Sequence, residues 1–280
     1  MMQFRVVHRT RIGYETEAAA SYNEARMSPL TSAHQVVVHT RLEVSPTPWS
    51  HTYRDYWGTE VTAFEVLDQH KELIVTATST VQVDRPAPLP GGLTWAEVRA
   101  HEVADLHCEQ LVVDERVAPE PDLAAQIEDL VTGSGGPTDF AHRLCQLVYD
   151  EVRYVSGSTA VEGHAADAWK ARSGVCQDMA HIVIGALRSA GVPARYVSGY
   201  LHPSTEPVPG ETVVGESHAW VEWWDGSWIG FDPTNNLDIG DRHVVVARGR
   251  DYADVPPLTG IFSGGGASQM DVEVEVTLLR

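Results

Sequence analysis

Cysteine is scarce in this sequence, with three residues among 280. Three scattered cysteines, Cys108, Cys145 and Cys176, cannot build the disulfide framework that stabilises small secreted domains, so we expect a reducing compartment. Basic residues are also few, because 20 Lys and Arg stand against 39 Asp and Glu and give a net charge of −19. A field of that sign repels the phosphate groups of nucleic acids, which are therefore not expected as partners.

Long apolar runs are missing as well. No segment reaches the roughly 18 to 20 apolar residues that a membrane span requires, and residues 1–9 lack the apolar core of a signal peptide. We therefore expect a cytoplasmic protein without a membrane partner. What the chain does contain, 43% hydrophobic and 21% charged residues, is ordinary for a protein that builds a packed core.

The first third of the chain has the pattern of β-strands. Short segments rich in Val and Thr are separated by turn-forming residues, and they lie at 4–7, 34–39, 61–66 and 72–81. This spacing predicts a small antiparallel β-sandwich. The pattern stops at residues 85–92, where prolines remove backbone donors and glycines add freedom. We therefore divide the chain into a β-rich N-terminal domain, residues 1–88, and a second domain, residues 89–280.

The second domain has a mixed pattern and carries most of the charge. It contains 12 basic and 29 acidic residues, a net charge of −17, whereas the first domain has 8 and 10, a net charge of −2. Apolar residues recur every three or four positions within 123–131 and 140–148, which predicts two helices. Strands return after residue 194, and the alternation at 272–276 predicts a last one. The expected fold class is therefore α+β.

Cys176 lies at the start of a third helical pattern, which runs on to Gly191 and Pro193, residues typical of a helix end. Unpaired N–H groups and the helix dipole at such a start stabilise a thiolate, and the same N–H groups can hold an oxyanion. The residue alone leaves two interpretations open, a nucleophile or a small buried hydrophobic side chain. Cys145, on the apolar face of its helix, is expected in the core.

His218 and Asp232 flank a predicted hairpin whose turn contains Asp225-Gly226. A three-residue loop, Trp224-Asp225-Gly226, would place 218 directly opposite 232, with both side chains on one face. A two-residue turn would place 218 opposite 233 and direct Asp232 to the other face. Both registers stay open, and a catalytic triad needs the first one or a bulge. In that case thiol, imidazole and carboxylate supply a nucleophile, a proton acceptor and an orienting group.

Four motifs, in this order, resemble those of the transglutaminase-like superfamily. They are Gly174-Val175-Cys176-Gln177-Asp178-Met179-Ala180-His181, Gly191-Val192-Pro193-Ala194-Arg195-Tyr196-Val197-Ser198-Gly199-Tyr200, Ser217-His218-Ala219-Trp220-Val221-Glu222 and Gly230-Phe231-Asp232-Pro233-Thr234-Asn235. The chain is similar to bacterial proteins with a β-rich transglutaminase-like N-terminal region ahead of a papain-like core. The resemblance implies an N-terminal antiparallel β-sandwich followed by a core in which the nucleophile helix packs on an antiparallel sheet.

The resemblance also implies a chemistry. Cys176 is expected as the nucleophile, His218 as its base and Asp232 as the residue that orients the imidazole. The family's reaction is acyl transfer at an amide through a thioester, which water resolves in peptidases and amidases and a lysine-type amine resolves in crosslinking enzymes. We expect a cysteine protease or amidase acting on amide or isopeptide bonds. A protein-glutamine transglutaminase and a noncatalytic binding module on the same fold are the alternatives.

Supporting residues follow from the same resemblance. Crosslinking members use a tryptophan upstream of the cysteine as an oxyanion donor, but Trp169 lies too close in sequence, so the Tyr154 hydroxyl is the candidate donor here. Gln177 is a second candidate, although a residue at a helix start can also serve only as a cap. Contacts with substrate are expected from three further residues, which are Trp220, Asp251 and Tyr252.

Metal and nucleotide motifs are missing from the sequence. The segment at 101–105 lacks the second histidine of a zinc-protease helix, and no glycine-rich phosphate loop follows a strand. We therefore expect neither a metal nor a cofactor. The expected partner is a peptide or protein substrate, and the charge of −17 on the second domain favours amine-bearing or lysine-rich ones.

Overall fold

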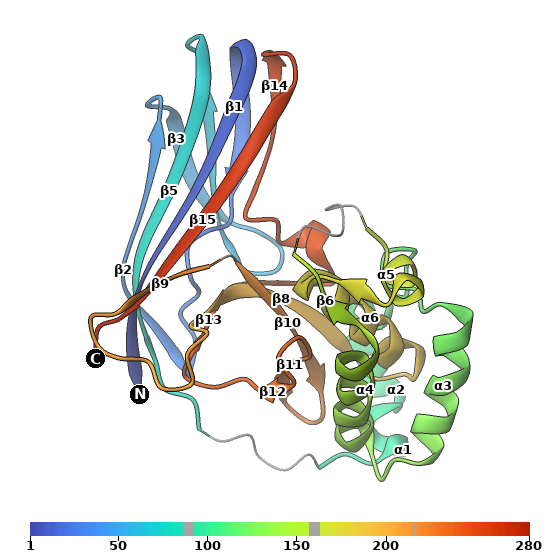
Figure 1. The fold of residues 1–280 in the computed structure, drawn as a ribbon. Helices are drawn as coiled ribbons and strands as arrows, with labels where there is room; N and C mark the ends of the chain where they lie inside the picture. The colour runs from blue at the N-terminus through green and yellow to red at the C-terminus, as the bar shows by residue number, and fades with distance from the viewer. Residues whose placement is uncertain (87–91, 157–162, 216) are drawn as a thin grey trace.

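The computed structural model describes residues 1–86, 92–156, 163–215 and 217–280 (Figure 1). A tall antiparallel sheet stands beside a second region, in which helices pack against a smaller sheet. The predicted domain boundary between residues 88 and 89 lies outside the described residues. Among the described residues, no helix has the length and apolar character needed to span a membrane.

The N-terminal region is β-rich and its large sheet is antiparallel, as predicted. Its central order is β2 (Gln35–Ser45), β5 (His70–Val83), β1 (Met2–Ala25), β15 (Ser268–Leu278) and β9 (Thr212–Gly215). Three further strands extend it around the second half of β1, and they are β3 (Trp49–Arg54), β4 (Glu60–Val66) and β14 (Leu258–Gly264). Hydrogen bonds therefore link eight strands into one sheet.

A burial pattern with a period of two explains how this sheet packs. In β5 alternate side chains are buried, and Leu73, Val75 and Ala77 pack with Met27 and Phe64 in a core of their own. Further along the same strand, Val81 and Val83 belong to the main core of the molecule. One face of β5 thus runs from the core of the large sheet into that of the second region.

The last strands of the chain join the first one. β15 pairs with β1 from Phe4↔Leu278 to Tyr14↔Ser268, so the two termini lie side by side (Figure 1). The strand predicted at 272–276 is confirmed as part of β15. The large sheet therefore contains strands from both sides of the predicted boundary, because β9, β14 and β15 all come from the second half of the chain.

The second region is built on a five-stranded antiparallel sheet. Its order is β12 (Leu237–Asp238), β11 (Trp228–Asp232), β10 (His218–Trp224), β8 (Ala194–Leu201) and β13 (His243–Gly249). The helical segments are α1 (Trp95–Val98), α2 (His101–Leu106), η1 (Cys108–Leu111), α3 (Pro121–Thr132), α4 (Pro137–Glu151), α5 (Ala165–Ala171), α6 (Cys176–Ser189) and η2 (Tyr252–Asp254). A short parallel pair, β6 (Arg153–Tyr154) and β7 (Ser173–Gly174), lies between α4 and α6 in the chain.

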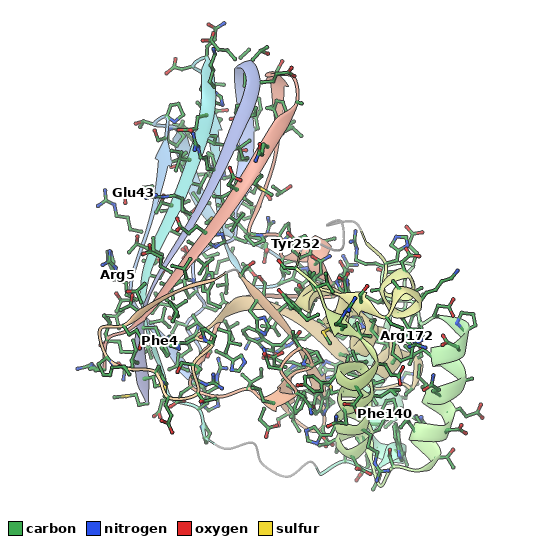
Figure 2. All side chains as sticks on the ribbon, viewed as in Figure 1. Phe4, Arg5, Glu43, Phe140, Arg172 and Tyr252 are labelled. Atoms are coloured by element: carbon green, nitrogen blue, oxygen red, sulfur yellow. The ribbon has the colours of Figure 1, made fainter. Side chains whose placement is uncertain are left out.

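Helix α6 is the central element of this region. It packs against β8 and β10 on one side and against α3, α4 and α5 on the other, and Figure 2 shows Phe140 of α4 among these helices. The fit is tight at Gly185, where an added Cβ would lie 1.7 Å from the Val117 carbonyl oxygen. The predicted α3, α4 and α6 are confirmed, and so is the α+β fold with a nucleophile helix on an antiparallel sheet.

Candidate active site

Cys176 is the first residue of α6, as its sequence context predicted. The Asp178 carboxylate caps this end of the helix by accepting the Val175 N–H at 2.7 Å. The preceding turn needs Gly174, because a Cβ there would lie 2.8 Å from the Asp178 side chain. Cys176 is half-buried, and it lies where the unpaired N–H groups of the first helical turn favour negative charge.

The hairpin of β10 and β11 has a register that the sequence did not predict. Trp224 faces Trp228 and Glu222 faces Gly230, so the loop is Asp225-Gly226-Ser227 and neither expected pairing of residue 218 is correct. The loop is fixed from outside the hairpin, since the buried Asp225 carboxylate accepts from the Leu93 N–H at 2.7 Å and the Thr138 hydroxyl at 2.6 Å.

The predicted contact between His218 and Asp232 nevertheless forms. His218 lies diagonally across from Asp232 on the same face of the hairpin, and its Nε2 is 2.6 Å from Asp232 Oδ2. The other ring nitrogen, Nδ1, is then left for Cys176, which hydrogen-bonds to the His218 side chain. Thiol, imidazole and carboxylate thus form one continuous chain from α6 through β10 to β11.

Asp232 is wholly buried and held by several donors. Its Oδ1 accepts the N–H groups of Thr234 at 3.0 Å and Asn235 at 3.1 Å, and its Oδ2 accepts from Asn235 Nδ2 at 2.7 Å. A second histidine, His243, places its Nε2 3.5 Å from the same Oδ2. Because the Gly240 N–H donates to His243 Nδ1, the proton of the neutral ring lies on Nε2, facing the carboxylate.

The electrostatics of the site keep a proton on His218. Burial lowers the pKa of His218, but hydrogen bonds and charge from Asp232 and Cys176 outweigh it and raise the pKa to about 10. Burial raises the pKa of Asp232, yet His218 and His243 together hold it well below its usual range. At neutral pH the site therefore contains an imidazolium between an aspartate and the cysteine sulfur.

Tyr154 lies beside the turn that precedes Cys176. It pairs with Gly174 in the short parallel ladder of β6 and β7, two residues before Cys176. Its half-exposed side chain and His218 line the same cavity of about 340 Å³, with Leu201 and Asn235. Gln177, the second residue of α6, is largely buried. The oxyanion roles of these two side chains stay predictions.

The three residues expected to contact substrate have different surroundings. Trp220 is wholly buried against His243, with ring centroids 5.3 Å apart, so it supports the site from behind, and its expected contact with substrate stays a prediction. Asp251 is also buried and caps η2 by accepting the Ala253 N–H at 2.7 Å, which leaves it inside the fold. Tyr252 is half-buried near the junction of the two regions (Figure 2).

The other histidine and cysteine candidates have structural positions. His181 of α6 is buried against Tyr196 and accepts the Tyr252 N–H at 3.1 Å, and burial with two nearby arginines lowers its pKa to about 3. Cys145 is in the core, as expected, and Cys108 is exposed. Among the described residues, no group of three or more His, Cys, Asp or Glu side chains forms a set of metal ligands.

Two residues that contact Asp232 were missed in the sequence. Asn235 follows the aspartate by three positions in the Asp232-Pro233-Thr234-Asn235 turn, and this spacing was a usable signal for an Asx-type turn. His243 gives no local signal, because it lies at the start of the valine-rich strand β13 and reaches Asp232 only through the order of the sheet.

Comparison with known proteins identifies the family of this chain. Residues 124–233 match the transglutaminase-like superfamily, and residues 4–82 match the bacterial transglutaminase-like N-terminal region. An uncharacterized protein from Mycobacterium leprae is 40% identical over 279 residues, which cover 100% of both chains. An uncharacterized protein from Mycobacterium tuberculosis is 34% identical over 294 residues, which cover 98% of this chain and 92% of that protein.

Two further matches have names that refer to an activity. A protein-glutamine gamma-glutamyltransferase from Pseudomonas aeruginosa is 36% identical over 108 residues, which cover 35% of this chain and 16% of that protein. The crystal structure of a "putative cysteine protease" from Cytophaga hutchinsonii has a TM-score of 0.78 at 22% identity, covering 100% of this chain and 91% of that one, and shows the same fold. The chain belongs to the transglutaminase-like superfamily and carries the bacterial transglutaminase-like N-terminal region.

Proposed function

We propose that this protein is a cysteine-dependent acyl-transfer enzyme that hydrolyses amide or isopeptide bonds through a thioester on Cys176. The observation that carries this proposal is the chain of three groups, in which Cys176 at the start of α6 hydrogen-bonds to His218 and His218 contacts buried Asp232 at 2.6 Å. These are the nucleophile, the proton carrier and the orienting carboxylate of a cysteine hydrolase.

In the first half of the reaction, the Cys176 sulfur attacks the carbonyl carbon of the substrate amide, and the carbonyl oxygen becomes an oxyanion. The N–H groups of the first turn of α6 and the Tyr154 hydroxyl stabilise that charge. The C–N bond then breaks, and the leaving amine takes the proton of the His218 imidazolium. A thioester and a neutral imidazole remain, with Asp232 holding the ring in place.

In the second half, neutral His218 accepts a proton from water as the water oxygen attacks the thioester carbon. The C–S bond breaks, a carboxylic acid leaves, and the site returns to a cysteine sulfur facing a protonated histidine. A primary amine that replaces water forms a new amide by the same steps. The geometry therefore supports hydrolysis and transamidation with one set of residues.

Transamidation is the second candidate, because a protein-glutamine gamma-glutamyltransferase is among the relatives. The two reactions separate in an assay of peptide and glutamine-amide substrates with and without an added primary amine. If the protein is a hydrolase, it forms free acid, and the added amine does not change the amount of acid. If it is a transamidase, the added amine is built into a new amide, and less acid forms. If neither product forms, and Cys176→Ala behaves like the wild type, the result contradicts the enzyme proposal and favours the alternative of a noncatalytic binding module.

The charge of the protein suggests the substrate class. The net charge is −19, and residues 89–280, with 12 basic and 29 acidic residues, carry −17 of it. A field of this sign raises the encounter rate of cationic peptides, so we propose lysine-rich or amine-bearing substrates. Rates for a cationic peptide should fall as salt is added, while rates for a neutral peptide stay level. An equal response of both peptides contradicts the assignment.

Tyr154 provides a test of the oxyanion assignment. Tyr154→Phe removes the hydroxyl, and loss of one oxyanion donor lowers the acylation rate by about 10² to 10³. Tyr149 of α4 is a matched control, because both tyrosines are 46% exposed and Tyr149 is not among the residues that line the cavity beside His218. Acylation measured in single-turnover experiments should fall for Tyr154→Phe and not for Tyr149→Phe. Equal rates for the two variants would remove Tyr154 from the mechanism.

A further inference from the structure

A second cavity, of about 470 Å³, lies on the face of the five-stranded sheet that carries Glu222. Its floor comes from β8, β10, β11 and β13, and its rim comes from the loop before β2 and from the residues after β5. The volume is in the range of pockets that bind small molecules. The charged lining is arginine-rich, with Arg85, Arg195 and Arg248 around Glu222, and we call this cavity the arginine pocket.

Glu222 binds two of the three arginines. Its Oε2 accepts from Arg195 Nε at 2.6 Å and from Arg248 Nε at 2.9 Å, and its Oε1 accepts from Arg248 Nη2 at 3.1 Å. Burial raises the pKa of Glu222, but the two arginines lower it to about 2, so the carboxylate is charged at neutral pH. Each guanidinium has five N–H donors, so both arginines keep donors that Glu222 does not use.

Arg85 forms no such ion pair within the part of the chain that the structure describes. Its backbone N–H donates to Asp241 Oδ1 at 2.7 Å, but its guanidinium Nη1 is buried without a hydrogen-bond partner among the described residues. Burial lowers the pKa of Arg85 to about 10, which still leaves it charged at neutral pH. Glu222 is also the one carboxylate among the described residues that line the pocket. The lining therefore has three arginines and one carboxylate, and Asp241, outside the lining, adds a second negative charge near Arg85.

A buried guanidinium nitrogen without a hydrogen-bond partner, such as Arg85 Nη1, is costly, because its removal from water is not offset by a hydrogen bond. An oxyanion that entered the pocket would accept the unused donors and neutralise the excess charge. The wall beside these donors is aromatic and apolar, since the Arg195 guanidinium lies 3.9 Å from the centre of the Trp228 ring, and Ile239 and Pro86 also line the space.

We propose that the arginine pocket binds a small organic oxyanion, a carboxylate or phosphate whose apolar body packs against Trp228. The charge of the pocket is opposite to the net charge of −19 of the whole protein, so its selectivity comes from local arginines. Such a ligand would also tie the residues after β5 to the sheet that carries His218.

The arginine pocket is distinct from the candidate active site. Glu222 and His218 lie on the same face of β10, four residues or about 13 Å apart. Trp220 fills the space between them and is wholly buried, in contact with His218 and His243. Binding in the pocket therefore does not require the Cys176 chemistry, and Cys176→Ala should bind the same anions.

The test is titration of the full-length protein with inorganic phosphate, phenyl phosphate, succinate and benzoate, with sodium chloride used to hold the ionic strength constant. Binding is followed by tryptophan fluorescence, since Trp228 lines the pocket, and by the rise in Tm that ligand binding to the folded state produces. We expect saturable binding, tighter for the aromatic member of each pair. The comparison of phosphates with carboxylates identifies the preferred head group.

Arg85→Gln is the diagnostic variant, because the Arg85 side chain takes no part in the Glu222 pairs. Loss of one charge-assisted contact should weaken binding about 10- to 100-fold. Arg248→Gln, which leaves the Arg195–Glu222 pair in place, is a second variant with the same expected effect. Arg41→Gln, an exposed arginine of β2 paired with Glu43, is the matched control and should bind like the wild type.

The outcomes separate binding from a purely structural role. Saturable binding by the wild type and by Arg41→Gln, weakened in folded Arg85→Gln and Arg248→Gln, supports the proposal. It is overturned if all four proteins respond alike, if sodium chloride alone gives the same response, or if no anion binds, most clearly so where Arg85→Gln also raises the Tm. The last result would mean that the buried charge is a cost with no ligand to offset it.

Discussion

Asp232→Asn is the substitution that probes the active site most deeply, because it changes one buried atom at the centre of the hydrogen-bond network. The wild-type Oδ2 contacts His218 Nε2 at 2.6 Å, Asn235 Nδ2 at 2.7 Å and His243 Nε2 at 3.5 Å. An amide in its place either turns an NH₂ group toward these donors or turns it toward the backbone N–H groups of 234 and 235. In both orientations the charge is lost and donors face donors.

The size of the effect follows from the pKa of His218. A rise from the usual 6.5 to about 10 corresponds to about 5 kcal/mol in favour of the imidazolium, which Asp232 and Cys176 supply against burial. Without the Asp232 carboxylate, the effect of burial is no longer outweighed, so the pKa of His218 falls toward or below 6.5. The ring is then mostly neutral at pH 7, and it no longer stabilises a thiolate. Loss of the orienting carboxylate lowers kcat by about 10⁴ in a well-studied serine-protease triad.

Alkylation of Cys176 by iodoacetamide reports the reactivity of the sulfur beside His218 and requires no known substrate. In the wild type, His218 remains protonated up to about pH 10, so an imidazolium faces the Cys176 sulfur throughout the range from pH 6 to 9. In Asp232→Asn the ring is mostly neutral at pH 7, so the alkylation rate at pH 7 should fall at least tenfold relative to the wild type. Asp238→Asn is the control, since Asp238 is an exposed carboxylate of β12 whose Oδ1 lies 3.9 Å from His142 Nε2, away from the triad.

The reasoning is refuted if Asp232→Asn keeps the wild-type alkylation rate at pH 7 while remaining folded. A titration of the His218 ring by NMR gives an independent reading of its protonation. The variant must show a pKa for His218 lower than that of the wild type, and an unchanged value contradicts the assignment of Asp232 as the group that holds the proton on the ring.

Two further predictions concern the framework that positions the site. Gly185→Ala places a Cβ 1.7 Å from the Val117 carbonyl oxygen, so it should lower the free energy of unfolding by about 3 kcal/mol or more. The control is Gly13→Ala, whose Cβ meets no atom within 4 Å and which should change the free energy of unfolding by less than about 1 kcal/mol. Arg188→Met removes a buried guanidinium that donates to the carbonyls of residues 112, 194 and 250, so it should lower the free energy of unfolding, measured with denaturant, by about 3 to 5 kcal/mol. The control is Arg143→Met, which removes an exposed i,i+4 ion pair and should lower the free energy of unfolding by less than about 1 kcal/mol. Near-equal costs for either variant and its control would contradict the packing described.

Local patterns were sufficient to predict the elements that carry the chemistry. The apolar spacing after Cys176 gave the correct start of α6, because a helix of this length has a strong period and a recognisable end at Gly191. The alternation at 272–276 gave β15 for the same reason. The motifs around these residues resembled the transglutaminase-like superfamily, and the family and fold were confirmed.

Long-range contacts account for what the sequence did not predict. The loop of the β10–β11 hairpin includes Ser227 because Leu93 and Thr138 hold Asp225 from outside, and no local pattern contains that information. Burial of Trp220 likewise depends on β13, which is adjacent to β8 in the sheet. The pairing of β15 with β1 joins opposite ends of the chain, which short-range periodicity cannot indicate.

The central claim is that Cys176 carries the acyl group during turnover. The most direct measurement is rapid-quench mass spectrometry of the protein mixed with a library of peptide and glutamine amides. The proposal predicts an acyl adduct on the peptide that contains Cys176, removable by hydroxylamine and absent from Cys176→Ala, which should also form no product. Product formation by Cys176→Ala at the wild-type rate, or turnover by the wild type with the adduct on another residue, would contradict it.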